Sequence, residues 1–262
     1  MIGFIGGGNM AEALIKGMTS VGMRDIAVYE PRTDRMEFLN RTYGVRKMPS
    51  NREVVSRCDI TILAVKPQIM DAVLDEIADA VTEERTIVSI AAGIPLSRLQ
   101  SKLRTERLVR VMPNTPALVQ EGMSVLSLCS CLPEKVIAPV REIFMSIGKI
   151  LTLPEKYMNV VTALSGSGPA FIALFVEGLI EAGVEAGLPA DTARELAVQT
   201  LIGTARLLEA GMAPDALRVM VTSPGGTTAA GLDVFRERGL GRIVSDAIGA
   251  AVTRAIELGR DR

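Results

Sequence analysis

Residues 2–11, with the sequence IGFIGGGNMA, decide the fold of this chain. The first four are typical of a short buried strand, and the residues after the glycines are typical of a helix. The spacing G-x-G-x-x-A lets Gly6 form a tight turn, lets a pyrophosphate approach the backbone at Gly8, and lets Ala11 pack closely on the strand. Unpaired N–H groups at the start of that helix favour a diphosphate. The stretch therefore predicts a dinucleotide pocket, with contacts from Gly6, Gly7, Gly8, Asn9 and Met10.

The composition favours a soluble protein of two domains. Of its 262 residues 48% are hydrophobic, 3% are aromatic and none is Trp, a balance suited to closely packed helices and sheets. Its 29 Lys and Arg offset 30 Asp and Glu, which gives no electrostatic reason to expect nucleic acid or a membrane surface as a partner. The most apolar later stretch, 170–176, ends at Glu177 and is far too short to cross a membrane.

Cysteine and histidine usage narrows the chemistry. The 3 Cys (Cys58, Cys129 and Cys131) form neither a disulfide framework nor a zinc spacing, so we expect a reducing, cytoplasmic location. The first residues show no basic n-region, and no secretion signal is expected. Because the chain contains 0 His, Ser-His triads and most zinc sites are excluded, no metal site is expected, and any catalysis must proceed without imidazole.

Strands and helices alternate over residues 1–154. Besides 2–5, strands are expected at 26–29, 59–65, 85–90 and 108–112, with further candidates at 123–128 and 149–153. Helices are expected at 9–21, 32–43, 69–80, 96–103 and from about 133. The apolar run 59–65 is typical of a central parallel strand covered on both faces. This alternation predicts an α/β fold with a doubly wound Rossmann sheet.

From Glu155 onward helical patterns replace the strands. Helices are expected at 168–187, 190–210, 214–221, 227–238 and 240–258. We therefore place a Rossmann domain at 1–154 and an all-α domain at 155–262. The helix 168–187 is apolar nearly all round and is expected inside a bundle or between subunits. A helical domain of this size has too little core of its own, so we expect a homodimer formed through it.

In a doubly wound sheet the ligand lies beyond the carboxyl ends of the strands. The segments there are small, kinked and mildly polar, which would let a flat ring approach the backbone, although ordinary strand-ending turns have the same composition. The expected cofactor contacts among them are Ala64, Val65, Lys66, Pro67, Ala91, Ala92 and Gly93, and the segment 112–116 is similar. Lys66 is expected to support phosphate or ribose, or to point into water, more than to donate a proton.

The end of the second strand bears on which nucleotide binds. Glu30 stands about twenty residues beyond the glycines, where an acid hydrogen-bonds the ribose hydroxyls of NAD. Arg32 and Arg35 could accommodate the extra phosphate of NADP, and Arg32 could equally be only the start of a solvated helix. The sequence leaves both NADH and NADPH open.

Two glycine-rich junctions interrupt the helical part. In 162–169, TALSGSGP, small hydroxyl residues surround a sharp turn before the long apolar helix. In 221–228, VTSPGGTT, backbone N–H groups gather at a helix start without a basic side chain, as in sites that hold a small carboxylate. Both junctions could also be plain caps, because Ser and Thr are good N-cap residues.

Together these segments resemble one enzyme family. The glycine turn 6–11, AVKP at 64–67 and the two junctions occur in the order found in the pyrroline-5-carboxylate reductases, and the likeness covers essentially the full length. The SPGGTT segment before a helix is the most specific motif. The resemblance implies a Rossmann domain and an all-helical domain similar to the C-terminal part of 6-phosphogluconate dehydrogenase, interlocked in a dimer. Some members assemble further into decamers.

The resemblance also implies a reaction. NADPH or NADH would deliver hydride to the C=N carbon of 1-pyrroline-5-carboxylate and give L-proline, the last step of proline biosynthesis. Glu155 would lie near the ring nitrogen, Thr162 would place a hydroxyl close to it, and Asn51 would contact the cofactor, as would the AVKP and AAG segments. The substrate carboxylate would lie on Ser223, Gly225, Gly226, Thr227 and Thr228.

The absence of histidine fits this chemistry. A cyclic imine takes its proton from water and binds as an electrophilic iminium, so its reduction needs mainly positioning and a site that tolerates positive charge. Glu155 would stabilise that cation, or would only cap the first helix of the second domain. Two residues depart from the family pattern, since Asn159 replaces a frequent Asp and Glu30 is unusual beside the frequent use of NADPH.

Two other functions fit the pattern less well. A 3-hydroxyacid dehydrogenase of similar build needs a Lys one turn after the glycine-rich junction, where this chain has Ile172, and an apolar side chain cannot move a proton. A non-catalytic nucleotide-sensing or scaffold protein would have no use for a second anion-binding helix start at 225–228.

Overall fold

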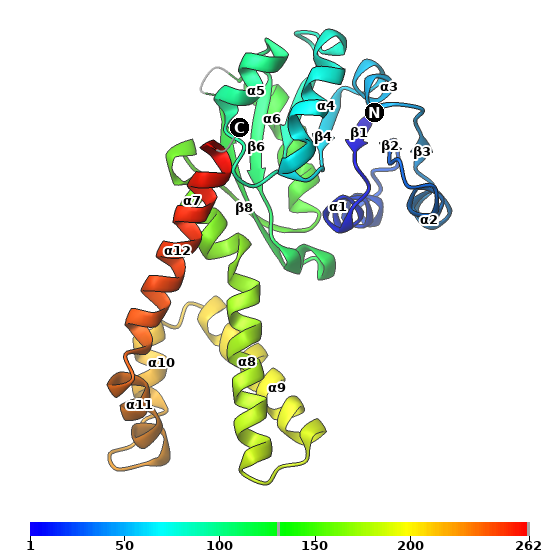
Figure 1. Cartoon of the computed structure of the whole chain (residues 1–262). Coiled ribbons are helices and arrows are strands. Elements are labelled where there is room, and N and C mark those ends of the chain that lie inside the picture. Colours follow the sequence, from blue (N-terminus) through cyan, green and yellow to red (C-terminus); the bar gives the residue numbers. More distant parts are fainter. Residues whose placement is uncertain (130–131, 261–262) are drawn as a thin grey trace. The chain divides into compact units, whose positions relative to one another are not determined.

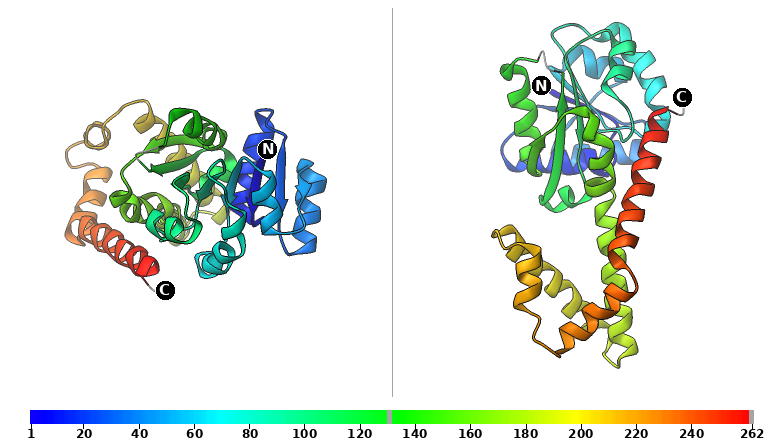
Figure 2. Two further views of the ribbon diagram at one scale, coloured as in Figure 1. Left: turned by 90° about the horizontal axis from the view of Figure 1, so that it is seen from above. Right: turned by 90° about the vertical axis from the view of Figure 1, so that its left-hand side faces the viewer.

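The computed structural model describes residues 1–129 and 132–260, so Cys131 lies outside the described residues. The chain forms two compact units (Figures 1 and 2). The first unit contains Met1–Pro169 and the residues from Ala250 on, and the second contains Ala170–Gly249.

The first unit is built on one sheet, in which the described residues form eight strands. The strands are β1 (Ile2–Ile5), β2 (Ile26–Tyr29), β3 (Arg46–Lys47), β4 (Ile60–Leu63), β5 (Thr86–Ser89), β6 (Leu108–Met112), β7 (Gly122–Leu128) and β8 (Gly148–Thr152). Their order is β3-β2-β1-β4-β5-β6-β7-β8, and the first six run parallel, whereas β7 is antiparallel to β6. The order of the first six strands is that of a dinucleotide-binding Rossmann sheet, which confirms the predicted fold class.

Helices cover both faces of this sheet (Figure 1). The α-helices are α1 (Asn9–Ser20), α2 (Thr33–Tyr43), α3 (Asn51–Arg57), α4 (Met70–Ile77), α5 (Leu96–Leu103), α6 (Glu134–Met145) and α7 (Met158–Val161). Short 3-10 helices are η1 (Pro67–Ile69), η2 (Ala78–Ala80), η3 (Thr115–Val119) and η4 (Glu155–Tyr157), and η5 (Thr162–Gly166) is a π-helical turn.

Two hydrophobic clusters fill the space between the sheet and these helices. Phe4 packs on one face with Leu14 of α1 and Phe144 of α6, and the next residue, Ile5, packs on the other face with Leu74 of α4. Successive residues of a strand point to opposite faces, so a continuous apolar run is what a strand covered on both sides requires. This packing on both faces fixes the carboxyl ends of the neighbouring strands β1, β4 and β5 side by side at one edge of the sheet.

The first unit extends beyond the predicted domain boundary at 154/155. Met158 and Val161 are buried against Val125 of β7, with Met112 and Leu153 beside them. This packing holds the residues up to Pro169 with the sheet, although their sequence is helical.

The second unit contains the helices that form the rest of the chain. These are α8 (Gly168–Glu185), α9 (Ala190–Glu209), α10 (Pro214–Met220), α11 (Thr227–Glu237) and the first half of α12 (Leu240–Arg260). No residue of α8 is buried, and Leu174 is 68% exposed. This helix is therefore not enclosed in a bundle within a single chain, where the helices border an open groove, and its other expected place, between subunits, stays a prediction.

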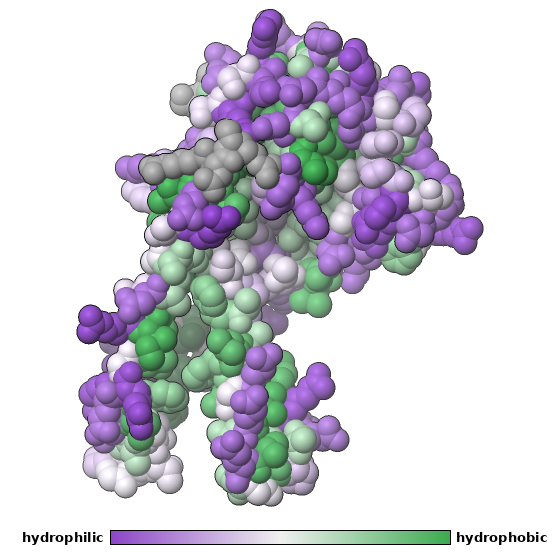
Figure 3. All heavy atoms as spheres, viewed as in Figure 1, coloured by the Kyte–Doolittle hydropathy of each residue, from purple (hydrophilic) through white to green (hydrophobic). Residues whose placement is uncertain are grey.

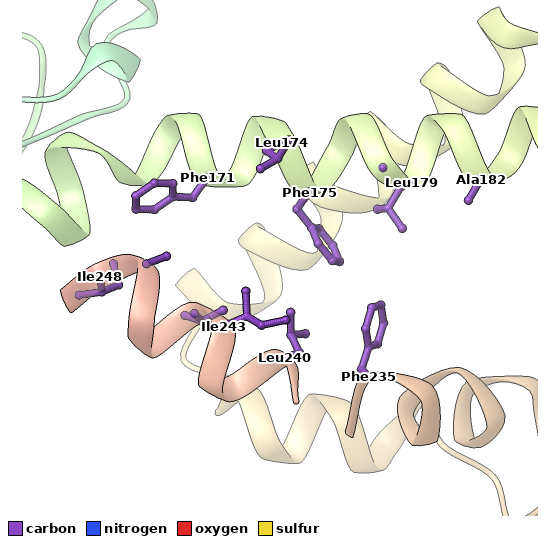
Figure 4. A pocket seen from close by; sticks show the side chains of 12 residues that line it. Phe171, Leu174, Phe175, Leu179, Ala182, Phe235, Leu240, Ile243 and Ile248 are labelled. Atoms are coloured by element: carbon purple, nitrogen blue, oxygen red, sulfur yellow. The ribbon is translucent and has the colours of Figure 1, made fainter. Parts of the chain in front are cut away.

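That groove is apolar and has a volume of about 590 Å³. Phe175 and Leu179 of α8 project toward Phe235 of α11, and Phe171 lies opposite Ile248 of α12 (Figure 4). The ring centroids of Phe175 and Phe235 lie 6.2 Å apart. Hydrophobic surface runs along the helices of this unit in Figure 3. An exposed apolar groove of this kind is typical of an interaction surface.

The apolar stretch 170–176, expected to be far too short to cross a membrane, is part of a longer described helical stretch, Glu155–Glu185, that has the length and apolar composition of a membrane-crossing helix. Length and composition are weak evidence by themselves, because core and interface helices of water-soluble proteins have the same features. Its first part packs on the sheet, and its last part borders the groove.

Candidate functional site

The glycine turn between β1 and α1 has the geometry that a dinucleotide needs. Gly6 has φ +94°, and a Cβ there would lie 2.7 Å from the carbonyl oxygen of Ala64, so no other residue fits without strain. Gly8 is the N-cap of α1, and a Cβ added to it would meet nothing within 4 Å. The outer side of the turn is therefore bare backbone open to a ligand, next to helix N–H groups without intrahelical acceptors. Asn9 and Met10 form the first turn of α1, and these residues fit a bound diphosphate.

The charged side chains of Glu30 and Arg35 hold this turn through hydrogen bonds to its backbone. Glu30, at the end of β2, accepts the Gly7 N–H at 2.8 Å through Oε2, and its Oε1 accepts the Nε–H of Arg32 at 2.9 Å. Arg35 donates to the carbonyl oxygens of Gly7 and Gly8 at 2.6 and 3.3 Å. It also pairs with Glu12 at 2.5 Å. The turn is thus held in place before any ligand arrives.

The Glu30 carboxylate carries its charge at neutral pH. Partial burial raises its pKa, but hydrogen bonds from Arg32 and from the Gly7 N–H outweigh burial and leave the pKa below its usual value. The side chain is only 7% exposed. Because Oε2 accepts one hydrogen bond and has a second lone pair, it can still accept from a ribose hydroxyl.

The remaining predicted cofactor residues follow other parallel strands or begin a helix. Ala64, Val65, Lys66 and Pro67 follow β4, and Ala91, Ala92 and Gly93 follow β5, all at the carboxyl edge of the sheet. Gly93 has φ +79° and lies against the end of α12, where a Cβ would be 3.0 Å from the Cβ of Leu258. Asn51 begins α3, is 7% exposed and donates to Glu76 at 2.7 Å, while its Oδ1 is buried without a partner among the described residues.

The predicted carboxylate cradle lies at the start of α11. Gly225 has φ +70°, the Gly226 N–H donates to the Ser223 carbonyl at 3.0 Å, and a Cβ on Gly226 would lie 2.4 Å from Ser223 Oγ. The first intrahelical bond runs from the N–H of residue 230 to the carbonyl of Gly226, which leaves the N–H groups of Thr227 and Thr228 without an acceptor in the helix. Gly226 is the N-cap and supplies no side-chain cap. The turn therefore presents backbone donors, as an anion site requires.

Thr162 begins the π-helical turn η5. Its Oγ1 donates to the Met158 carbonyl at 2.7 Å, so the hydroxyl oxygen keeps lone pairs for another donor. The Ser167 N–H donates to the Thr162 carbonyl at 2.9 Å, which closes the widened turn. Such turns occur frequently at functional sites.

Glu155 has a partner that the sequence reasoning missed. Its Oε1 accepts from Arg110 Nη1 at 3.1 Å and from the Leu96 N–H at the start of α5 at 2.7 Å. The Arg110 side chain is 6% exposed, and burial lowers its pKa, although the hydrogen bond and charge of Glu155 oppose that effect. The signal was present, because an Arg inside a central apolar strand must find a buried partner. Glu155 therefore compensates a buried cation and caps α5, and its predicted contact with substrate stays a prediction.

Comparison with known proteins places this arrangement in one family. The curated pyrroline-5-carboxylate reductase of Synechocystis is 40% identical over 263 aligned residues, which cover 99% of this chain and 98% of that protein. The chain belongs to the pyrroline-5-carboxylate reductase family.

Family models and solved structures agree with this assignment. The model described as pyrroline-5-carboxylate reductase dimerisation matches residues 155–258 of this family member, and the model described as NADP oxidoreductase, coenzyme F420-dependent, matches residues 1–93. The pyrroline-5-carboxylate reductase of Coxiella burnetii has a TM-score of 0.90 at 35% identity and covers 98% of this chain and 97% of its own. The Plasmodium falciparum pyrroline carboxylate reductase, solved with NADP bound, has a TM-score of 0.89 at 32% identity with the same coverage. The fold of this pyrroline-5-carboxylate reductase family member is therefore that of its relatives over nearly the whole chain.

Proposed function

We propose that this chain is an NAD(P)H-dependent reductase that converts 1-pyrroline-5-carboxylate to L-proline. The observation that carries the proposal is 40% identity to a curated pyrroline-5-carboxylate reductase along the full length. Two backbone cradles support it, one at Gly6–Gly8 and one at Ser223–Thr228, because one suits a diphosphate and the other a small carboxylate.

Three parts of the site have a role in this proposal: the glycine turn, the start of α11 and Thr162. The glycine turn binds the diphosphate of the reduced nicotinamide nucleotide, which supplies the hydride when bound. The N–H groups of Thr227 and Thr228 orient the substrate through its carboxylate, so that the ring is fixed at one end. The Thr162 hydroxyl oxygen accepts a hydrogen bond from the protonated ring nitrogen. Because the iminium arrives already charged, no side chain has to move a proton before reduction.

A direct assay tests the reaction. Protein is mixed with chemically prepared 1-pyrroline-5-carboxylate and NADH or NADPH, the absorbance of the reduced nicotinamide is followed, and the product is identified by chromatography. We expect one L-proline for each nucleotide oxidised. Oxidation without proline, or no oxidation with either nucleotide, contradicts the proposal.

We further propose that the protein prefers NADH to NADPH. Glu30 places an ionised carboxylate, 7% exposed, at the end of β2, where it can accept from the ribose hydroxyls of NADH and would repel the added phosphate of NADPH. Arg35, which contacts the turn, is already engaged by two backbone carbonyls and Glu12.

Glu30→Ser is expected to move the preference toward NADPH. The substitution removes the repelling charge and frees Arg32, so the ratio of the two dissociation constants should change about 10- to 100-fold, or about 1.4–2.8 kcal/mol. Calorimetric titration with each nucleotide, without imine, measures this ratio. Glu37→Ser, which removes a partly exposed acid of α2 that pairs with Lys47, is the matched control and should leave the ratio unchanged. A wild-type protein that binds NADPH more tightly contradicts the proposal.

We also propose that two copies associate through the second unit to form a homodimer. The α8 face has no buried residue in one chain, the groove beside it is apolar, and the matched dimerisation model spans the same helices. A second copy would remove this surface from water, and burial of apolar area drives association.

Leu174→Asp is expected to yield monomers. Leu174 is 68% exposed in the single chain, and a carboxylate buried at an interface without a partner costs several kcal/mol. Sedimentation at micromolar concentration should give twice the chain mass for wild type and one chain mass for the variant. Val21→Asp, at a 58% exposed position of the first unit, should stay dimeric. A monomeric wild type contradicts the proposal, and ten chain masses would indicate the decamer seen in some members.

The cytoplasmic location expected from the low cysteine content remains part of the proposal. Cell fractionation tests it, because a cytoplasmic protein stays with the soluble fraction when membranes are removed.

A further inference from the structure

Every second residue from 110 to 114, along β6 and the residues that follow it, contacts the segment 155–166. Arg110 pairs with Glu155, Met112 lies so close to Gly166 that a Cβ there would come within 2.5 Å of its methyl carbon, and Asn114 binds Ser165. Positions two apart along an extended chain share one face. The segment 155–166 therefore lies along one face of this strand and its extension.

The Asn114 side chain links the segment 155–166 to the strand β7. Its Nδ2 donates to Ser165 Oγ at 3.2 Å, and its Oδ1 accepts the Met123 N–H of β7 at 2.9 Å. The backbone at Asn114 is extended, with φ −135° and ψ 167°, so its side chain continues the β6 pattern. The carboxamide is fixed at both ends, because one group donates and the other accepts.

Ser165 lies inside the π-helical turn that begins at Thr162. A π-helical turn is rare and occurs frequently at functional sites. Two contacts from the β6 side hold this one, the hydrogen bond from Asn114 and the packing of Met112 on Gly166. The loop that carries Asn114 follows a parallel strand, at the edge where a dinucleotide-binding sheet holds its ligand.

We propose that Asn114 is a positioning residue for the imine reduction, which acts by holding Ser165 and thereby the place of the Thr162 hydroxyl. The inference rests on the proposed reductase function. Asn114 does not contact the reacting atoms in this proposal, and its carboxamide sets the distance between the cofactor-side loop and the turn that faces the ring nitrogen. Misplacement of a catalytic group by about 1 Å costs on the order of 100-fold in rate.

A double-mutant cycle tests the coupling between Asn114 and Ser165. Asn114→Ala, Ser165→Ala and the double variant are compared with wild type for kcat, for KM of the imine, for the dissociation constant of NADH and for Tm. Each single variant is expected to lose about 10- to 100-fold in kcat while NADH affinity stays within about twofold, because the glycine turn is untouched. The double variant should lose no more than the worse single variant. Ser165→Thr keeps the hydroxyl and should recover most of kcat.

Gln120→Ala is the matched control. Gln120, just past the other end of η3, makes the same kind of bond, from Nε2 to Ser20 Oγ at 3.1 Å, but on the surface. It should leave kcat unchanged.

The outcomes separate this inference from the proposed function. An inactive wild type refutes the reductase function. If wild type is active, the inference fails when the single variants keep full kcat, when their losses add in the double variant, or when kcat falls only as far as the folded fraction at the assay temperature.

Discussion

Gly6→Ala is expected to lower both the thermal stability and the NADH affinity, whereas Gly8→Ala should lower the affinity alone. Gly6 has φ +94°, and its added Cβ would lie 2.7 Å from the Ala64 carbonyl oxygen. This strain costs about 1–3 kcal/mol, and in a chain of this size about 2–4 °C of Tm follows from each kcal/mol. The displaced turn can no longer fit a diphosphate, so NADH affinity should fall at least about 100-fold.

Gly8→Ala is the matched control in the same turn. It has φ −67°, and its added Cβ meets no atom within 4 Å, so the free protein should keep its Tm within about 2 °C, the change expected from less than 1 kcal/mol. The same methyl group stands where the diphosphate would approach the backbone, so NADH affinity should fall as well. Melting curves without nucleotide and calorimetric titration with NADH measure the two effects. If Gly8→Ala binds NADH as tightly as wild type, the diphosphate does not lie on this turn.

Glu155→Ala is expected to destabilise the first unit by about 3 kcal/mol, near the lower end of the range for breaking a buried ion pair. The Arg110 side chain is 6% exposed and loses its partner, and the Leu96 N–H loses its acceptor. Glu155 itself is 33% exposed, which lets water replace part of the lost interaction. Urea unfolding measures this change in the free energy of unfolding.

Glu155→Gln separates stability from chemistry. The amide oxygen can still accept from Arg110 and Leu96, so part of the stability should return, although the buried Arg110 cation no longer has an opposite charge beside it. If Glu155 stabilises the iminium, kcat/KM in Glu155→Gln should fall by more than the loss of folded protein at the assay temperature explains; unchanged kcat/KM would leave Glu155 a structural residue only. Glu134→Ala breaks the more exposed pair with Arg141, 2.5 Å apart, and should change stability by less than about 1 kcal/mol. Glu155→Ala with wild-type stability would contradict the assigned role of the pair.

The sequence predicts most elements because their patterns are local. The strands 2–5, 26–29 and 108–112 and the helix 96–103 have the same bounds in sequence and structure, and the other predicted elements are shifted by a few residues at most. β3 was missed because Arg46–Lys47 is two polar residues long. α3 was missed because its polar sequence gives little periodicity, although Ser50 caps it by accepting from the Glu53 N–H.

Contacts that join distant segments could not be predicted in the same way. Arg110 and Glu155 are 45 positions apart, and Asn114 and Ser165 are 51 apart, so no local spacing connects them. An Arg inside an apolar strand predicts only that a buried partner exists. The exposure of α8 in a single chain could not be predicted, because an apolar helix has the same sequence pattern whether its own chain or a second chain covers it.

Transfer of isotope tests the proposed reduction most directly. NADH that carries deuterium at the transferred position of its nicotinamide ring is incubated with the protein and 1-pyrroline-5-carboxylate, and the proline is examined by NMR and mass spectrometry. We predict one deuterium per molecule, on the ring carbon that was doubly bonded to nitrogen. Proline without deuterium at that carbon, or no proline, would contradict the assignment of this chain as a reductase of the cyclic imine.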